Sequence, residues 1–246
     1  MKKLILRLAA LFTGLALVFT TAFFAANARK APSSDSILTD VFPSVNKKEG
    51  NLTVILDPGH GGMDGGAVGL DGTLEKELNL ALAQKAAKLL TLMGYRVVLT
   101  RDSDQMLGDG ESGHKKLADL KYRLEMASSY ENAVLVSIHM NKFPLESCSG
   151  IQLYYSANNE QSLLLGKELH RAVGDFQKDN KRELKKADSA IYLLDRTTQP
   201  AILMECGFLS NGTECALLQQ ESYQEKLALL IASAICAYEE QTAPKE

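Results

Sequence analysis

The fold is decided by one stretch, residues 54–62, which reads VILDPGHGG. Its first three residues are apolar and typical of a buried strand, and the glycine-rich turn that follows contains one histidine, His60. Such a turn places the imidazole at the carboxyl edge of a sheet, where open α/β sheets bind their ligands. Two further apolar runs lead directly into a reactive side chain, one into His139 and the other into Glu205. We therefore expect three reactive side chains at the ends of three buried strands, a pattern that indicates a metal hydrolase.

Hydrophobic periodicity predicts strands that alternate with helices. Strands are expected at residues 53–56, 95–100, 133–138, 151–155, 191–194 and 201–206, and helices at residues 75–93, 116–129, 161–176 and 223–238. This alternation is typical of a largely parallel sheet that is covered by helices on both faces. The sequence therefore predicts an α/β fold in the form of a three-layer domain.

The first 50 residues are expected to direct the chain rather than to fold with it. Lys2 and Lys3 precede an apolar stretch at residues 4–26, and a small-x-small cleavage site follows at residues 26–28. The stretch is also about long enough to span a bilayer. Residues 1–28 are thus a signal peptide or a membrane anchor, and both alternatives predict an exported protein. Residues 29–50 have little periodicity and are expected to be a linker.

Composition narrows the class of protein. The chain has 246 residues, of which 46% are hydrophobic, so one domain can bury a sufficient core. The formal net charge of −3 argues against a nucleic-acid partner, because nucleic-acid-binding domains are usually basic. The four cysteines are expected to be small buried hydrophobes, because their spacing is that of neither a zinc knuckle nor a disulfide framework. Cys206 is not expected to be a nucleophile, since the adjacent Glu205 would raise its pKa.

A zinc hydrolase commonly binds its metal through three His or carboxylate ligands and leaves one position for water. His60, His139 and one acid are the candidates here. Glu75 is the preferred acid, because it opens the helix after the loop of His60 and the helix dipole favours a carboxylate at that position. Glu77 competes, but it lies about 200° around the helix from Glu75, so both cannot face one metal. Glu205 is the candidate general base and acid, because burial would raise its pKa towards neutrality.

Each of these residues also has a purely structural interpretation, as a tight turn, a core histidine or an ion-pair partner. Their occurrence at three strand ends favours the functional interpretation. His114 lies in a polar segment and is expected on a surface loop, and His170 lies off the apolar face of its helix and is expected to be solvated. A solvated connection, rather than a site for an anionic glycan, is expected for a basic cluster made of Lys178, Lys181, Arg182, Lys185 and Lys186.

Several motifs resemble the zinc-dependent N-acetylmuramoyl-L-alanine amidases of the amidase-3 family. In family order they are LDPGHGGMDGGAVG (56–69), LEKELNL (74–80), LTRDSD (99–104), SIHMN (137–141), GIQLYY (150–155) and PAILMECGFLSN (200–211). The resemblance implies Zn²⁺ ligands at His60, Glu75 and His139 and a catalytic glutamate at Glu205, in agreement with the interpretation of the residues alone. It also implies a catalytic domain at residues 51–246 with a mixed, mostly parallel six-stranded sheet. The implied reaction is hydrolysis of the amide between N-acetylmuramic acid and L-alanine in peptidoglycan.

A narrower resemblance concerns residues 108–123, GDGESGHKKLADLKYR. Together with the membrane-directing N-terminus, this segment is similar to the spore-cortex, germination-specific amidases. That similarity implies a part in muramic-δ-lactam formation, alongside a polysaccharide deacetylase. Cys206 departs from the family pattern, in which a residue without a thiol is commoner after the catalytic glutamate.

Three alternatives stay open at this point. The chain could be a general cell-wall or division amidase, a zinc carboxypeptidase-like peptidase, or a catalytically idle wall-binding protein. The peptidase would need an arginine to hold the terminal carboxylate of its substrate, and Arg101, Arg123 and Arg196 are the candidates.

Overall fold

The computed structural model describes residues 52–108 and 114–243. These residues contain one six-stranded sheet. Its strands are β1 (Thr53–Pro58), β2 (Arg96–Leu99), β3 (Ala133–Asn141), β4 (Gln152–Tyr155), β5 (Lys185–Lys186) and β6 (Ala201–Phe208). The order across the sheet is β2-β1-β3-β6-β4-β5. Neighbouring strands pair in parallel, except that β4 and β6 are antiparallel. The mixed, mostly parallel sheet of six strands is thereby confirmed.

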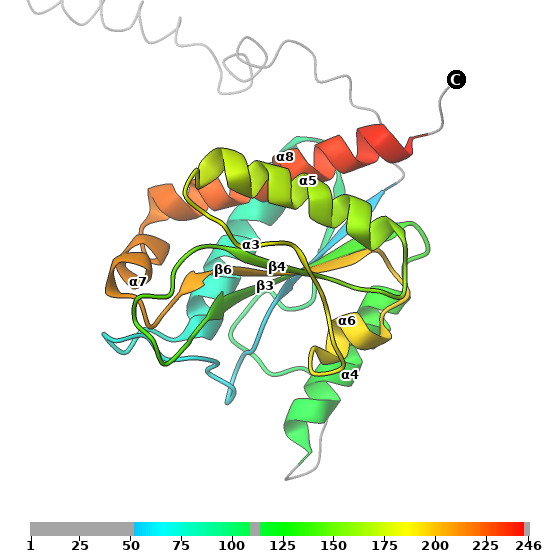
Figure 1. Cartoon of the computed structure of the whole chain (residues 1–246). Coiled ribbons are helices and arrows are strands. Elements are labelled where there is room, and N and C mark those ends of the chain that lie inside the picture. The colour runs from blue at the N-terminus through cyan, green and yellow to red at the C-terminus, as the bar shows by residue number, and fades with distance from the viewer. Residues whose placement is uncertain (1–51, 109–113, 244–246) are drawn as a thin grey trace, which may run out of the picture. The chain divides into compact units, whose positions relative to one another are not determined.

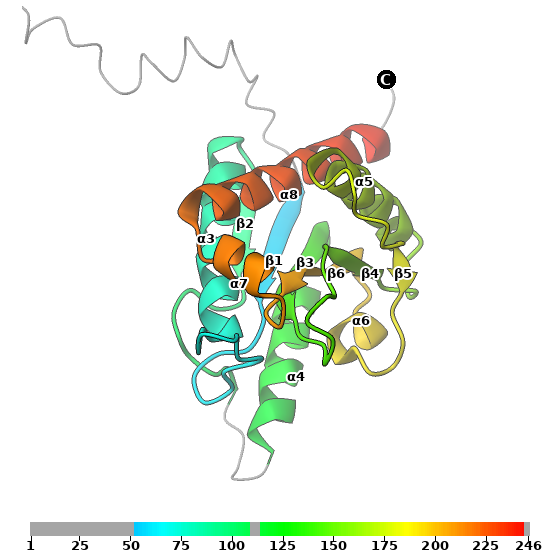
Figure 2. The same ribbon diagram turned by 60° about the vertical axis from the view of Figure 1, so that its left-hand side comes forward.

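Helices cover both faces of this sheet, as Figures 1 and 2 show. They are α3 (Glu75–Leu92), α4 (Lys115–Ser128), α5 (Gln161–Phe176), α6 (Tyr192–Arg196), α7 (Gly212–Leu218) and α8 (Glu221–Thr242). Buried side chains from α3, α5, α7 and α8 join one apolar cluster, and those from α4 and α6 join a second cluster. The predicted three-layer α/β fold is therefore confirmed.

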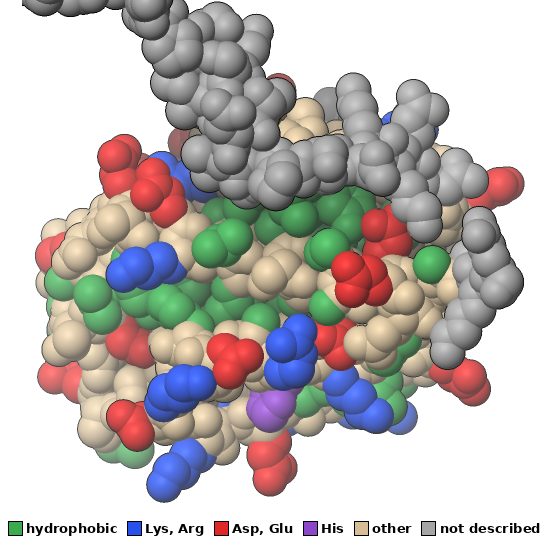
Figure 3. Space-filling view, turned by 90° about the horizontal axis from the view of Figure 1, so that it is seen from above, with side chains coloured by type: hydrophobic (Ala, Val, Ile, Leu, Met, Phe, Trp, Pro, Cys, Tyr) green, Lys and Arg blue, Asp and Glu red, His purple; other side chains and the backbone are tan. Residues whose placement is uncertain are grey.

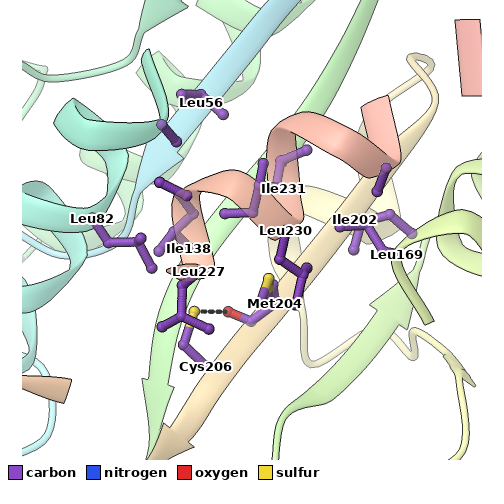
Figure 4. Close-up of a cluster of buried hydrophobic side chains, with 14 of the residues drawn as sticks. Leu56, Leu82, Ile138, Leu169, Ile202, Met204, Cys206, Leu227, Leu230 and Ile231 are labelled. Atoms are coloured by element: carbon purple, nitrogen blue, oxygen red, sulfur yellow. Dashed lines mark hydrogen bonds between the residues drawn. The ribbon is translucent and has the colours of Figure 1, made fainter. Parts of the chain in front are cut away.

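The alternation of side chains along a strand assigns each residue of the sheet to one of these clusters. Most even-numbered residues of the central strands β1, β3 and β6, such as Val136 and Met204, lie in the larger cluster beneath α3, α5 and α8. The apolar odd-numbered residues, such as Leu135 and Leu203, lie in the smaller cluster beneath α4 and α6. Figure 4 shows side chains of α8, including Leu230, projecting towards the even-numbered side chains of β6. By the same alternation, the reactive residues of β3 and β6 face α4 and α6.

The prediction of a short strand at residues 191–194 is wrong, because this segment forms the start of helix α6. Leu193 and Leu194 are still buried in the smaller cluster. A short apolar run fits either a strand or a buried helical turn, and its periodicity does not separate the two. The sixth strand is β5 instead, which pairs with β4 and lies within the predicted basic connection.

The other predicted elements are confirmed with small shifts of their ends, and α5 keeps its predicted bounds. Helix α7 was not predicted. It begins after Asn211, whose side chain accepts a hydrogen bond from the Glu214 amide at 3.1 Å. A capping residue followed three positions later by Glu is a signal for a helix start, so the sequence contained the information.

The surface over α5 and α8 mixes charges of both signs with hydrophobic side chains (Figure 3). His170 on α5 is exposed as predicted, although its Nε2 lies 3.0 Å from the carbonyl oxygen of Arg182. The lysines of the basic cluster are exposed as well. Within residues 52–108 and 114–243, none of the helices has the length and apolar character needed to cross a membrane. The predicted signal peptide or anchor at residues 1–28 and the linker at 29–50 lie outside the described residues.

Candidate metal centre

His60 lies in a tight turn at the carboxyl end of β1. Its backbone has a positive φ of 61°, and the next two residues, Gly61 and Gly62, have φ values of 141° and 54°. Gly59 has no room for a side chain, because a Cβ atom there would lie 2.1 Å from Cε1 of His139. The absence of a side chain at Gly59 therefore allows the ring of His139 to pack directly against the turn that carries His60.

Glu75 is the first residue of α3, and only 3% of its surface is exposed. Its Oε2 atom accepts a hydrogen bond from the backbone amide of Ala67 at 2.7 Å. Its Oε1 atom lies 2.9 Å from Nδ1 of His139 and 3.2 Å from Nε2 of His60. The loop between β1 and α3 thus fixes one carboxylate oxygen and leaves the other facing both histidines.

His60, Glu75 and His139 each offer one potential ligand atom, and these atoms all lie within 4.8 Å of one another. Glu77 is exposed, as the helical geometry predicted. Two imidazole nitrogens and one carboxylate oxygen are the donor set of a catalytic zinc site with a position left for water. The three residues therefore fit the metal that the sequence predicts.

Electrostatics in this cluster follow from the charges around the two histidines. Burial acts to raise the pKa of Glu75, but hydrogen bonds to His139 and His60 outweigh it and hold this pKa well below its usual value. Burial acts to lower the pKa of His60, but Glu75 and Asp64 together raise it. Asp64 contributes because its Oδ2 lies 3.0 Å from Nδ1 of His60, on the side of the ring away from Glu75. The carboxylate of Asp64 thereby orients the imidazole, as second partners of metal-binding histidines commonly do.

Glu205 lies beside this cluster because β3 and β6 pair in parallel with His139 opposite Glu205. Its Oε2 atom is buried and has no hydrogen-bond partner among the described residues. Burial raises the pKa of Glu205 to about 7, with a further increase from the charge of Glu75 and a partial offset from the two histidines. A carboxyl group with a pKa near neutrality can both accept and return a proton at physiological pH.

A cavity of about 240 Å³ lies over His60, His139 and Glu205. Its far wall consists of residues from α4 and α6, including Leu120 and Tyr192. Both His139 and Glu205 sit within their strands rather than at the ends, since β3 continues to Asn141 and β6 to Phe208. They can do so because their side of the sheet opens into this cavity instead of the apolar core.

Two of the three arginines considered for a substrate carboxylate are already engaged. Arg101 donates to four backbone carbonyl oxygens, and Arg123 forms ion pairs with Asp57 and Asp119. This weakens the peptidase alternative. The side chain of Arg196 is exposed and stacks on Tyr192.

The remaining histidines and cysteines lie as follows. His114 is exposed, as predicted. All four cysteines are free, and Cys206 and Cys215 are buried, whereas Cys148 and Cys236 are partly buried. The pKa of the Cys206 thiol is well above its usual value because of burial and the charge of Glu205, as the sequence predicted.

Residues 54–237 match the Amidase_3 family, described as N-acetylmuramoyl-L-alanine amidase. The chain belongs to this family. It is therefore an N-acetylmuramoyl-L-alanine amidase, an enzyme that acts on peptidoglycan.

Three relatives each match about three quarters of this chain. The germination-specific N-acetylmuramoyl-L-alanine amidase of Bacillus subtilis is 36% identical over 188 residues, which cover 75% of this chain and 78% of the relative. The structure of the CwlD amidase from Clostridioides difficile, in complex with the GerS lipoprotein, is 39% identical with a TM-score of 0.73 and covers 77% of this chain and 98% of that one. The catalytic domain of CwlV from Paenibacillus polymyxa is 32% identical with a TM-score of 0.67, at 76% and 98% coverage.

Proposed function

We propose that this amidase works with one zinc ion held by His60, Glu75 and His139, and that Glu205 is its general base and acid. The observation that carries the proposal is the approach of the three potential ligand atoms to within 4.8 Å of one another. The buried Oε2 atom of Glu205 in the same cavity supports it, because a buried polar atom without a partner among the described residues costs stability, and such atoms are found at catalytic sites.

The protein's own residues have separate tasks in this proposal. Zinc, when bound, would act as a Lewis acid that lowers the pKa of a water molecule and stabilises negative charge on the amide oxygen of the substrate. Glu205 accepts the proton of the attacking water and returns it to the departing nitrogen of L-alanine. Asp64 holds the ring of His60, and the Ala67 amide holds the carboxylate of Glu75.

We further propose that the enzyme acts on the spore cortex. Hydrolysis of the muramoyl amide frees a carboxyl group on the lactyl arm of the sugar. Closing a δ-lactam also requires a free amine on that sugar, which a polysaccharide deacetylase would expose. Support comes from the 36% identity to a germination-specific amidase and the 39% identity to CwlD.

The proposed substrate lies outside the cytoplasm, so the proposal requires export through residues 1–28, either as a signal peptide or as an anchor. Because the CwlD structure contains the GerS lipoprotein, a lipoprotein is a further candidate partner for this chain.

Digestion of purified peptidoglycan by the full chain tests the activity. Mass spectrometry should find glycan strands without peptide and free stem peptides that begin with L-alanine. A chelator should abolish these products and added zinc should restore them. Products shortened at the carboxyl end of the stem peptide would support the peptidase alternative instead, and unchanged masses would support a wall-binding protein.

The cortex role needs a separate experiment. The chain would be expressed during sporulation in a Bacillus subtilis strain that lacks its germination-specific amidase. Muramic-δ-lactam in the spore peptidoglycan is the expected result, and the Glu205→Gln variant is the matched control. A chain that digests peptidoglycan in vitro but leaves the spores without lactam would be a general cell-wall amidase.

A further inference from the structure

Two buried arginines hold the turn that carries His60. Arg101 and Arg123 are only 1% and 2% exposed. Arg101 donates from Nε to the carbonyl oxygen of Pro58 at 3.0 Å and from Nη2 to that of Gly59 at 2.9 Å. Arg123 donates from Nη1 to Pro58 at 2.9 Å and from Nη2 to the carbonyl oxygen of His60 at 2.7 Å. Three successive carbonyl groups of the turn are therefore bound by two guanidinium groups.

The turn needs such support because of the backbone of His60. Among residues 52–108 and 114–243, His60 is the only residue other than glycine with a positive φ. A side chain in this left-handed conformation brings its Cβ atom close to the backbone, which costs free energy. Strained residues of this kind persist where the surrounding structure over-determines them.

Arg101 also connects this turn to the helix that carries Glu75. Its Nη2 atom donates to the carbonyl oxygen of Lys76 at 2.8 Å as well as to that of Gly59. Lys76 directly follows Glu75 in the first turn of α3. One nitrogen atom thus ties the segment of the first potential ligand to the segment of the second. Asn79 of α3 adds a parallel connection, because its Nδ2 donates to Gly59 at 3.1 Å.

The two arginines differ in what holds them. Arg123 is fixed by charge, with its Nη1 atom 2.6 Å from Asp57 and its Nε atom 2.7 Å from Asp119. The hydrogen bonds of Arg101 all go to backbone carbonyl groups. Removing Arg123 would leave two buried carboxylates without their cation, whereas removing Arg101 leaves only carbonyl groups short of a donor. Arg101 is therefore the position at which the turn can be loosened with the smaller effect on folding.

We propose that Arg101 is a positioning residue of this amidase, which sets the separation of His60 and Glu75 by tying the Gly59 carbonyl to the Lys76 carbonyl. Arg123 secures the opposite side of the same turn. The inference rests on the zinc site proposed above. Arg101 acts through the backbone of the turn, and it lies outside the lining of the cavity.

Zinc affinity is the first measurement, by competition with a chelator, on the full chain and well below the melting temperature of every variant. Arg101→Met should weaken zinc binding about 10-fold to 100-fold, the usual effect of losing a group that orients a metal ligand. Arg101→Lys should lie between this variant and the wild type, because an ammonium group replaces only some of the hydrogen bonds. Leu227→Ala, a change to a fully buried residue of the apolar cluster, is the control for lost stability and should bind zinc normally.

Wild-type zinc affinity in Arg101→Met would overturn the proposal. An equal loss of affinity in Leu227→Ala would also overturn it, because the effect would then follow from stability alone.

A second measurement needs no metal. The chain contains four histidines, so labelling histidine with ¹³C and ¹⁵N gives a simple spectrum. A left-handed residue brings its own amide and Hα protons close together, so metal-free wild type should show a strong cross-peak between them for His60. Arg101→Met should weaken this cross-peak and leave that of His170 unchanged, whereas a full-strength His60 cross-peak in the variant contradicts the proposal. If the wild type binds no zinc, the proposed function fails in that respect, and this spectrum still decides the role of Arg101.

Discussion

The two faces of the sheet differ most between β3 and β6. On the face beneath α8, the even-numbered side chains remain apolar up to Met140 in β3 and Cys206 in β6. On the face beneath α4 and α6, the same strands change from apolar residues to Ser137, His139 and Glu205. Each strand thus contributes to the core with one side and to the candidate centre with the other. Substitutions on the face beneath α4 and α6 should therefore change catalysis, whereas substitutions on the face beneath α8 should change stability.

The largest effect is expected at the proposed metal ligands. Glu75→Ala should lose zinc and activity together, because one of three ligands is removed from a site whose total binding free energy is roughly 10 kcal/mol or more. Glu77→Ala, two positions along the same helix, is the matched control and should keep both, since Glu77 faces solvent. Metal analysis and muropeptide digestion measure the pair. The reverse result would move the third ligand to Glu77.

The next effect concerns proton transfer alone. Glu205→Gln should keep zinc and the fold, and lose about 10² to 10⁴ in turnover, because the amide is nearly isosteric but cannot accept a proton. Turnover on peptidoglycan, zinc content and the melting temperature would be measured on the same preparation. Near-normal turnover would show that another group is the base.

On the apolar face, the expected effect is on stability and not on chemistry. Leu227→Ala should lower the free energy of unfolding by about 2–5 kcal/mol, since this side chain is completely buried and the change leaves a cavity. Leu229→Ala on the same helix is the control and should change stability little, because Leu229 is 58% exposed. Denaturant titration gives both values. Loss of activity from Leu227→Ala at a temperature where the variant is folded would contradict the separation of the two faces.

The smallest expected effect is a loss of stability at acidic pH, caused by protonation of Asp57. This residue lies on the same face of the sheet as His139. Burial acts to raise the pKa of Asp57, but Arg123 and the hydroxyl groups of Ser137 and Thr100 lower it to about 2. The folded pKa is thus below the unfolded value of 3.8, so the stabilisation is complete above about pH 5 and is lost as the pH falls through 3.8 towards about 2. The difference corresponds to ~2 kcal/mol.

Denaturant titrations between pH 5 and pH 2 measure this contribution. The stability of the wild type should fall by ~2 kcal/mol more than that of Asp57→Asn, which has no carboxyl group to protonate at this position. Parallel curves for the two proteins would show that the pKa of Asp57 is not lowered by folding.

The sequence predicted the residues of the candidate centre better than their supports. His60, His139 and Glu205 each come after an apolar run, and this local pattern was enough to predict that they lie near the same edge of the sheet. Glu75 could be preferred over Glu77 because the angle between residues of a helix is fixed. The roles of these residues stay predictions until the variants are measured.

The two arginines that support the turn could not be predicted, because their role depends on contacts between distant parts of the chain. Arg123 lies more than 60 positions after the turn that it binds. Its burial contradicts the usual preference of arginine for the surface, and only the presence of Asp57 and Asp119 in the folded chain explains it. The left-handed backbone of His60 is equally hidden, because few residues other than glycine adopt it. The wrong strand at residues 191–194 shows a different limit, since a short apolar run does not specify its own secondary structure.

The parallel pairing of His139 with Glu205 has a consequence for how this enzyme can diversify. The separation of their backbones is set by the spacing of adjacent hydrogen-bonded strands, which is about 4.8 Å in any sheet. Insertions or deletions within residues 142–149, which are mostly exposed, should therefore leave that spacing untouched. The loop between β1 and α3 has no such freedom under the proposed function, because it carries His60 and leads directly into Glu75. Laboratory evolution of new wall specificities should accordingly accept length changes after β3 and reject them after β1.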